Sequence, residues 1–252
     1  MTDPTPKPQI LTSADQTSTA DAIADQFVNR LIGCDHAHIS VTGGGLGSAI
    51  WPKIAAHPEV GDVPWNRIHI WFSDERFVPA GDVDRNDTAV IPVAGELGIP
   101  PENVHSVPGP ELVPTVDAAA YAYALHLGAK QTHRSECVAA PVFAVSILGI
   151  GPDGHVASLF PGRPELTVTQ KTVVPVNDSP KPPPQRVSFT RPTLMQCEEL
   201  WMIAAGAEKA SAVARAITGG DPSRTPASNL HGRRATLWFV DAAAAAKLPK
   251  DD

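Results

Sequence analysis

Residues 142–155 read VFAVSILGIGPDGH, an apolar run that ends in a turn with three glycines. The β-branched segment Val142–Ile147 is typical of a buried strand. Two further apolar segments, His38–Val41 and Arg67–Phe72, also end in short loops, one of glycines and one of charged residues. Strands that end in such loops and are followed by helices predict a mostly parallel sheet, with its ligand site at the carboxyl ends of the strands.

Outward from these strands, the chain alternates between strand and helix patterns. Asp15–Gly33 has apolar residues at helical spacing, which predicts a helix before the first strand. Two proline-rich stretches, Val107–Pro114 and Ser179–Pro184, predict surface loops, and residues 1–8 predict a frayed tail. The other predicted helices are 46–57, 86–97, 116–129, 208–217 and 242–248, and the other predicted strands are 186–189, 199–204 and 236–240.

The composition excludes several classes of protein. With 252 residues, 42% of them hydrophobic, the chain fits one α/β domain over residues 1–252. A net charge of -7 argues against nucleic acid or a membrane surface as a partner. The N-terminus does not resemble a signal peptide and no apolar run could span a bilayer, so we expect a cytoplasmic protein. The sequence does not encode the oligomeric state visibly, and a monomer is the default expectation.

Metal and cofactor motifs are missing from the sequence. The cysteines Cys34, Cys137 and Cys197 are odd in number and widely spaced, which predicts buried thiols and no disulfide framework. The nine histidines are scattered and no H-E-x-x-H occurs, so we expect no metal site. Neither a G-x-x-x-x-G-K-[ST] loop nor a G-x-S-x-G elbow is present. We therefore expect chemistry without a cofactor.

The first loop at the predicted sheet edge is Thr42-Gly43-Gly44-Gly45-Leu46-Gly47-Ser48. Consecutive glycines between a strand and a helix let backbone N–H groups surround an anion, and the helix N-terminus adds positive potential. The alternative is a tight turn, but a turn needs fewer glycines than this loop has. We expect Gly43, Gly44 and Gly45 to contact a phosphate or a sugar.

The second loop is Ser73-Asp74-Glu75-Arg76-Phe77-Val78-Pro79. Two acids and an arginine at a strand end are not typical core residues, although a solvated loop would also explain them. Arg76 has the fork geometry that binds a phosphate or a carboxylate, and Asp74 or Glu75 can orient it. We also expect Asp74 and Glu75 to be among the residues that bind the substrate.

The third loop, Gly149–Gly162, places Asp153 and His155 on either side of a glycine. It contains a literal G-x-G-x-x-G, but this follows a late strand and no acidic residue lies in Lys171–Asn177, so a dinucleotide site is not expected. A histidine suits proton transfer near neutral pH, and a neighbouring acid can fix its tautomer. A lone histidine is more often structural, but this position favours catalysis.

Two further basic residues are candidates. Arg186 lies on a predicted strand, and Lys209 lies at the start of a helix, where the helix dipole disfavours a cation. Lys209 is expected either to meet an anion or to pair, in solvent, with Glu208 or Glu199.

The string LGIGPDGHVASLFPG at 148–162 resembles the signature of the 6-phosphogluconolactonases. The stretches SDERFVP at 73–79, RVSFTRP at 186–192 and GAEK at 206–209, together with Asn86, resemble further motifs of that family in the same order. PASNL at 226–230 and WFVDAAA at 238–244 resemble its C-terminal end. The resemblance covers nearly the whole chain and is highly specific.

The resemblance implies a mostly parallel, Rossmann-like α/β sheet with helices on both faces and a small α+β lobe that contributes to the site. It implies hydrolysis of 6-phospho-D-glucono-1,5-lactone to 6-phosphogluconate, the second step of the oxidative pentose phosphate pathway. Glucosamine-6-phosphate deaminases share the fold and a similar G-x-G-x-D-G-H string, but theirs continues as I-A-F-N-E-P, whereas this chain has Val156–Pro161, VASLFP. That difference favours the lactonase.

One loop departs from the family pattern. The family often has G-G-S-[TL]-P where this chain has Gly43–Gly47, so a hydroxyl contact from this loop falls to Thr42 or Ser48. The family also often has S-N before the next helix, where this chain has Arg85-Asn86, which suggests an added positive charge at the rim of the site.

These residues suggest a mechanism. The phosphate is held by the glycine amides, by Arg76 or Arg191, and by Lys209, while His155 activates a water and Asp153 orients His155 or a ring hydroxyl. Arg76 or a backbone N–H of residues 149–154 stabilises the oxyanion. The competing hypotheses are a deaminase or isomerase of the same fold, which would release ammonia from glucosamine-6-phosphate, and a non-catalytic sugar-phosphate sensor, which would have lost Asp153 or His155.

Overall fold

A seven-stranded sheet forms the centre of the molecule, seen in a computed structural model that describes residues 7–131 and 138–249. The strand order is β1-β10-β9-β6-β2-β3-β5, and every neighbouring pair is parallel. The predicted parallel α/β sheet is thus confirmed. The strands are β1 (Gln9–Ser13), β2 (Ala37–Val41), β3 (Ile68–Phe72), β5 (Val104–His105), β6 (Phe143–Gly149), β9 (Cys197–Ala204) and β10 (Ala235–Asp241).

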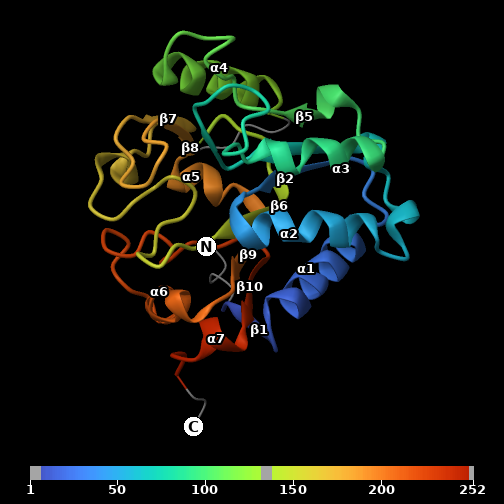
Figure 1. Cartoon of the computed structure of the whole chain (residues 1–252), viewed down its shortest axis with the longest axis vertical. Helices are drawn as coiled ribbons and strands as arrows, with labels where there is room; N and C mark the ends of the chain where they lie inside the picture. The colour runs from blue at the N-terminus through green and yellow to red at the C-terminus, as the bar shows by residue number, and fades with distance from the viewer. Residues whose placement is uncertain (1–6, 132–137, 250–252) are drawn as a thin grey trace, which may run out of the picture.

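Helices cover both faces of this sheet (Figure 1). Side chains alternate along a strand, so Trp201 and Ile203 of β9 pack under α1 and α2, whereas Leu200 and Met202 face the opposite layer. The first layer holds α1 (Gln16–Leu31), α2 (Gly44–Ala55) and α3 (Ile91–Glu96). The second layer holds α4 (Val116–Ala129), α6 (Ala210–Ile217) and α7 (Ala242–Ala245).

A second, antiparallel sheet forms the small lobe that the sequence predicted. Its order is β4 (Asp74–Arg76), β8 (Arg186–Phe189) and β7 (Val173–Val176). The short helix α5 (Arg191–Leu194) follows β8 directly, and β7 and β8 pack against α4. A single residue, Ser73, separates the end of β3 from the start of β4. The lobe is therefore attached to the edge of the central sheet where the site was expected.

The element bounds agree best where the local pattern is strong. α4 and β8 begin and end at the predicted residues. The predicted helix 86–97 is wrong in its first half, which forms a 3₁₀ turn at Asp87–Ala89 before α3 begins at Ile91. Pro92 lacks a backbone N–H and therefore fits the first turn of a helix better than its interior. The frayed tail predicted at residues 1–8 lies mostly outside the described residues.

The two described cysteines are free thiols. Cys197 is buried and Cys34 is half-buried, so the expectation of buried thiols holds fully for Cys197 only, and Cys137 lies outside the described residues. Within residues 7–131 and 138–249, no helix is both long and apolar enough to cross a lipid bilayer.

Five histidines that are far apart in the sequence meet in the fold, which corrects the view of scattered histidines. They lie on β2, β3, β5 and α4 and next to β2, with ring centroids of successive neighbours 4.6–5.2 Å apart. The Nδ1 atom of His69 lies 2.9 Å from Nε2 of His105. The cluster consists of His36, His38, His69, His105 and His126.

Candidate active site

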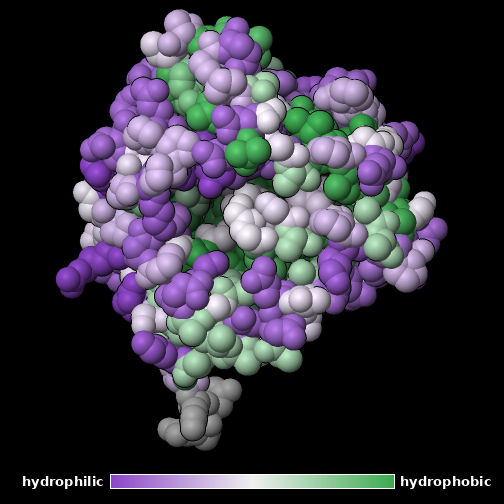
Figure 2. All heavy atoms as spheres, in the orientation of Figure 1, coloured by the Kyte–Doolittle hydropathy of each residue, from purple (hydrophilic) through white to green (hydrophobic). Residues whose placement is uncertain are grey.

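The site lies where the sheet order changes direction. β2 and β6 are neighbours, yet the chain leaves β2 toward β3 and leaves β6 toward β9, so their carboxyl-terminal loops open a crevice between them. A cavity of about 230 Å³ occupies this crevice. In the space-filling view the surface is hollowed beside the start of α2, and hydrophilic side chains gather around the hollow (Figure 2).

Residues from every predicted site loop line this cavity, together with residues of the small lobe. The lining consists of Thr42, Gly43, Gly44, Gly45, Leu46, Gly47, Asp74, Arg76, Asn86, Gly149, Ile150, Gly151, Pro152, His155, Ala157, Lys181, Arg186, Ile203 and Lys209.

The glycine loop forms the start of α2. Gly43 caps this helix without a side-chain hydrogen bond, and a Cβ atom added to Gly44 or Gly45 would meet only open space. The first N–H groups of a helix lack internal partners and attract anions. At Gly43, by contrast, a Cβ atom would lie 1.8 Å from Oδ1 of Asn86, so only glycine fits. Thr42 lines the cavity and Ser48 does not, which leaves Thr42 as the hydroxyl beside the loop.

His155 and Asp153 form a dyad on the loop after β6. The Nδ1 atom of His155 lies 2.5 Å from Oδ1 of Asp153, and the imidazole stacks on Phe160 with centroids 4.6 Å apart. Gly151 permits this fold-back, because a Cβ atom there would lie 2.0 Å from Nδ1 of His155. With Nδ1 donating to the carboxylate, Nε2 carries the lone pair and can accept a proton.

Asp153 stays ionised in this arrangement. Partial burial alone would raise its pKa, but the hydrogen bonds and the electrostatic interaction with His155, together with the positive charge of Lys181, lower the pKa of Asp153 to about 2. Lys181 places its Nζ atom 3.8 Å from Oδ1 of Asp153 and 3.4 Å from Nδ1 of His155. The carboxylate is thus a permanent acceptor that holds the His155 ring in one tautomer.

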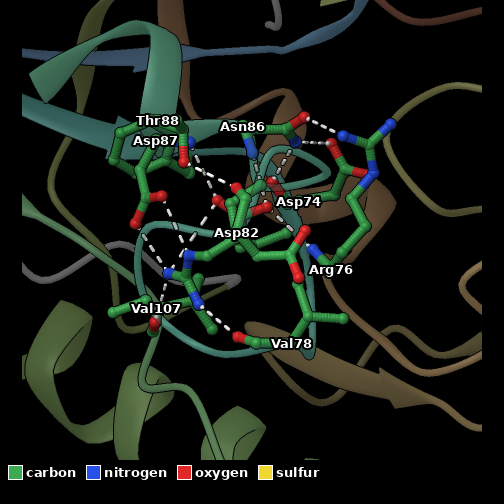
Figure 3. A network of polar contacts seen from close by, with 12 residues as sticks. Asp74, Arg76, Val78, Asp82, Asn86, Asp87, Thr88 and Val107 are labelled. Atoms are coloured by element: carbon green, nitrogen blue, oxygen red, sulfur yellow. Dashed lines mark hydrogen bonds and ion pairs between the residues drawn. The ribbon is translucent and has the colours of Figure 1, made fainter.

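Arg76 and Asn86 connect the second loop to the cavity (Figure 3). Arg76 donates from Nη1 to Oδ1 of Asn86 at 2.7 Å and to the carbonyl of Asp84 at 2.6 Å. Asn86 donates in turn to the carbonyl of Asp74 at 2.7 Å, and the Asp74 carboxylate accepts from Ser158 at 2.6 Å. The Nε atom of Arg76 is buried without a hydrogen-bond partner among the described residues.

Lys209 is the cation with the fewest partners. It lines the cavity, and its side chain forms no hydrogen bond or ion pair with any residue in the described part of the chain. Burial lowers its pKa, the neighbouring acids Glu208 and Asp241 oppose this, and Lys181 lowers it further. Two lysines therefore face the same space, in which an anion would compensate their charge.

Three predicted site residues lie elsewhere. Arg191 does not line the cavity, because its guanidinium donates to the backbone carbonyls of Pro226 and Ser228. Glu75 is fully buried behind the cavity wall. Arg85, expected at the rim, is also buried and binds Asp87 through two hydrogen bonds.

Lys181 is the site residue that sequence reasoning missed. It lies in the loop Ser179–Pro184, which the prolines predicted to be a surface loop and which we name the strap. Arg186 fixes this strap by donating to the carbonyls of Lys181, Pro182 and Pro183 at 3.0–3.1 Å. A lysine flanked by prolines is held in a stiff segment, and that was the available signal. Among the described residues, no group of three or more His, Cys, Asp or Glu could hold a metal ion.

Comparison with known proteins gives the same family that the sequence motifs resemble. Residues 14–238 match the family model described as glucosamine-6-phosphate isomerases/6-phosphogluconolactonase. The 6-phosphogluconolactonase of Streptomyces coelicolor is 38% identical over 96% of this chain and 95% of its own. That of Mycobacterium tuberculosis is 40% identical over 84% of this chain and 85% of its own. The structure of 6-phosphogluconolactonase from Trypanosoma brucei has the same fold, with a TM-score of 0.82 and 24% identity over 96% of this chain and 99% of its own.

Proposed function

The chain belongs to the glucosamine-6-phosphate isomerase/6-phosphogluconolactonase family, and we propose that its cavity hydrolyses 6-phospho-D-glucono-1,5-lactone with His155 as the general base. The protein is an enzyme, and its reaction consumes one water to open a lactone into 6-phosphogluconate. The observation that carries the mechanism is the Asp153–His155 dyad at the edge of a cavity lined by cations and free amides.

The phosphate end of the substrate fits the glycine loop and Lys209. The open amides at Gly44 and Gly45 supply N–H donors at a helix start, and Lys209 supplies a charge without a partner in the described chain. This leaves Arg76 for the lactone end. The other cation near the dyad, Lys181, already lies close to the Asp153 carboxylate.

The chemical steps then use the remaining groups. Nε2 of His155 takes a proton from a water as its oxygen attacks the lactone carbonyl, and Arg76 stabilises the oxyanion that forms. When the tetrahedral intermediate collapses, the bond from the carbonyl carbon to the ring oxygen breaks. Protonated His155 gives its proton to that oxygen, which becomes a hydroxyl of the product. All the residues invoked come from one chain, so we propose that a monomer is sufficient.

The direct test is the disappearance of freshly made 6-phosphoglucono-δ-lactone at neutral pH, measured against its spontaneous hydrolysis and with EDTA present. Faster loss of the lactone with the protein supports the proposal. If the lactone decays at the spontaneous rate while glucosamine-6-phosphate releases ammonia, the deaminase hypothesis replaces it. If the protein binds 6-phosphogluconate but accelerates neither reaction, the site is a sensor.

Replacing Lys209 with alanine should raise KM for the phosphorylated lactone by about 10-fold or more, because a hydrogen bond to a charged group contributes roughly 1.5–3 kcal/mol. Hydrolysis of unphosphorylated glucono-δ-lactone should change little, since that substrate has no group for Lys209 to bind. The measurement is KM and kcat for both lactones with the wild type and the variant.

Lys53 provides the matched control for the loss of one positive charge. It pairs with Asp21 on the surface at 2.8 Å and does not line the cavity, so Lys53→Ala should leave both KM values unchanged. An equal loss on both lactones in Lys209→Ala would show that Lys209 does not bind the phosphate.

A further inference from the structure

Glu75 lies behind the cavity wall and binds three backbone amides. Its Oε1 atom accepts from the N–H groups of Arg76 at 2.8 Å and Asn86 at 2.7 Å, and its Oε2 atom accepts from that of Asp87 at 3.0 Å. The side chain is 0% exposed. One carboxylate thus joins β4 to the loop ten residues further along the chain.

Arg85 completes this buried unit. Its guanidinium lies 3.9 Å from Glu75 and holds the Asp87 carboxylate with hydrogen bonds of 2.9 and 2.6 Å. Its remaining donors reach the carbonyls of Val78 at 3.1 Å and Val107 at 2.8 Å. The beginning of the loop, at Arg76 and Val78, and its end, at Asn86, are therefore anchored to the same charged centre.

This centre is connected to the cavity through two residues. Arg76 and Asn86 both receive their backbone position from Glu75, both line the cavity, and they bind each other through Nη1 and Oδ1 at 2.7 Å. Asn86 also packs against the glycine loop, since a Cβ atom on Gly43 would collide with it. A shift of the Glu75 carboxylate would move the guanidinium and the amide together.

A gain in stability does not account for this arrangement. Buried ion pairs are on balance close to neutral for stability, because desolvation of the charges offsets their attraction. Burial raises the pKa of Glu75 to about 7, and the amides of Asn86 and Arg76 and the charge of Arg85 only partly oppose this. Burial of the Glu75 carboxylate thus costs free energy of folding, while its hydrogen bonds fix the loop between Arg76 and Asn86.

We propose that Glu75 is a positioning residue for lactone hydrolysis, which holds Arg76 and Asn86 in the cavity through their backbone amides and is itself held by Arg85. The proposal rests on the proposed function, because Arg76 is the residue through which Glu75 acts. The sequence left open whether Glu75 orients Arg76 or contacts the substrate, and its burial and its three backbone hydrogen bonds favour the first role.

The test is a double-mutant cycle of Glu75→Gln and Arg76→Ala. Glutamine has the same shape but turns an amide N–H₂ toward backbone N–H groups, so the loop must shift. In the wild-type background Glu75→Gln should lower kcat by about 10- to 100-fold with KM nearly unchanged, as expected for a displaced catalytic group. In the Arg76→Ala background the same change should cost less than about 3-fold, because the residue it positions is gone.

The melting temperature separates positioning from folding. Glu75→Gln should lower it equally in both backgrounds, whereas its effect on kcat should differ between them. A loss of kcat of the same size in both backgrounds would overturn the proposal and make Glu75 a merely structural residue. If Glu75→Gln does not fold, Arg85→Lys replaces it in the cycle, because lysine keeps the charge and loses the fork that binds Asp87.

Two further measurements keep the outcomes distinct. Glu96→Gln is the matched control, since Glu96 is exposed on α3, outside the unit of Glu75 and Arg85, and its loss should leave kcat unchanged. Affinity for 6-phosphogluconate, measured by calorimetry in the same cycle, does not require turnover. If the wild type hydrolyses no lactone, the proposed function fails, but loss of binding in Glu75→Gln that vanishes in the Arg76→Ala background still supports positioning. Additive losses of binding contradict it.

Discussion

Replacing His155 with alanine should lower kcat for the phosphorylated lactone by about 10²- to 10⁴-fold, the usual contribution of a general base. Nε2 of this imidazole has no hydrogen-bond partner among the residues that the structure describes, and Asp153 holds the opposite nitrogen at 2.5 Å. Within residues 7–131 and 138–249, no other side chain that lines the cavity combines a free nitrogen base with such an orienting partner. KM should change less, because the phosphate contacts remain. Steady-state kinetics on freshly prepared lactone give both constants.

Two controls make this result specific. His57 lies at the end of α2 beside Asp25, away from the cavity, so His57→Ala should keep wild-type turnover. The alanine at position 155 also leaves a space over the ring of Phe160, into which added imidazole can diffuse. Partial recovery of kcat with imidazole, and none in the wild type, identifies the missing group as a base. Near-wild-type turnover of His155→Ala would move the base elsewhere and leave the reaction assigned.

The sequence predicted which loops meet at one edge of the sheet, because strand ends in a parallel sheet have a fixed geometric meaning. Gly43–Gly45, Arg76 and His155 are far apart in the chain, but all follow apolar strands, and the sheet brings their loops to one edge. Neither their mutual distances nor the direction of each side chain follows from that rule.

The directions of the Arg191 and Glu75 side chains did not follow from the sequence. Both stand in motifs that belong to the site region, and their residue types suit an anion or a sugar. Arg191 is the first residue of α5, and its side chain instead donates hydrogen bonds to the backbone carbonyls of Pro226 and Ser228. These two residues lie more than 30 positions further along the chain. Long-range backbone contacts of this kind leave no local pattern.

The small lobe was predicted only in outline for a related reason. Strand β4 consists of Asp74–Arg76, three polar residues without alternation, and it forms because β8 offers an antiparallel partner. Its pairing with β8 aligns Arg76 with Arg186 and thereby brings the strap that carries Lys181 next to the dyad. Tertiary pairing, which short windows of sequence do not encode, decides such strands.

The histidine cluster should make the fold sensitive to mild acid. Burial, followed by the charges of neighbouring histidines and Lys130, lowers the pKa of His38 to about 3, of His69 to about 4 and, in the same way, of His105 to about 3. In the unfolded chain each would titrate near 6.5. Below that pH the unfolded chain binds protons that the folded chain does not, so stability is full above about pH 7 and falls as the pH decreases toward 4.

At pH 5 each of these three histidines should lower the free energy of unfolding by about 1–2 kcal/mol relative to pH 7.5. The three histidines together contribute about 3–6 kcal/mol, but Glu75, whose pKa burial raises to about 7, gains a proton in the folded chain over the same pH range and offsets roughly 2 kcal/mol of this loss. The net loss of about 1–4 kcal/mol should lower the melting temperature by roughly 5–10 °C. Urea unfolding at the two pH values measures the difference directly. Equal free energies of unfolding at pH 5 and 7.5 would contradict the prediction, because protonation of the histidines would then not destabilise the folded chain.

His105→Phe tests which residues carry the effect. Phenylalanine keeps a ring stacked on Trp71, whose centroid lies 3.9 Å from that of His105, but it cannot take up a proton. The loss of stability between pH 7.5 and 5 should therefore shrink by about 1–2 kcal/mol in this variant. His57→Gln, outside the cluster, should leave that loss unchanged. The ring of His69 loses its partner at 2.9 Å in His105→Phe, so the variant is less stable at pH 7.5, and only the change with pH reports the titration. An unchanged pH dependence in His105→Phe would contradict a contribution of His105 and leave the acid sensitivity to the other titrating groups of the fold.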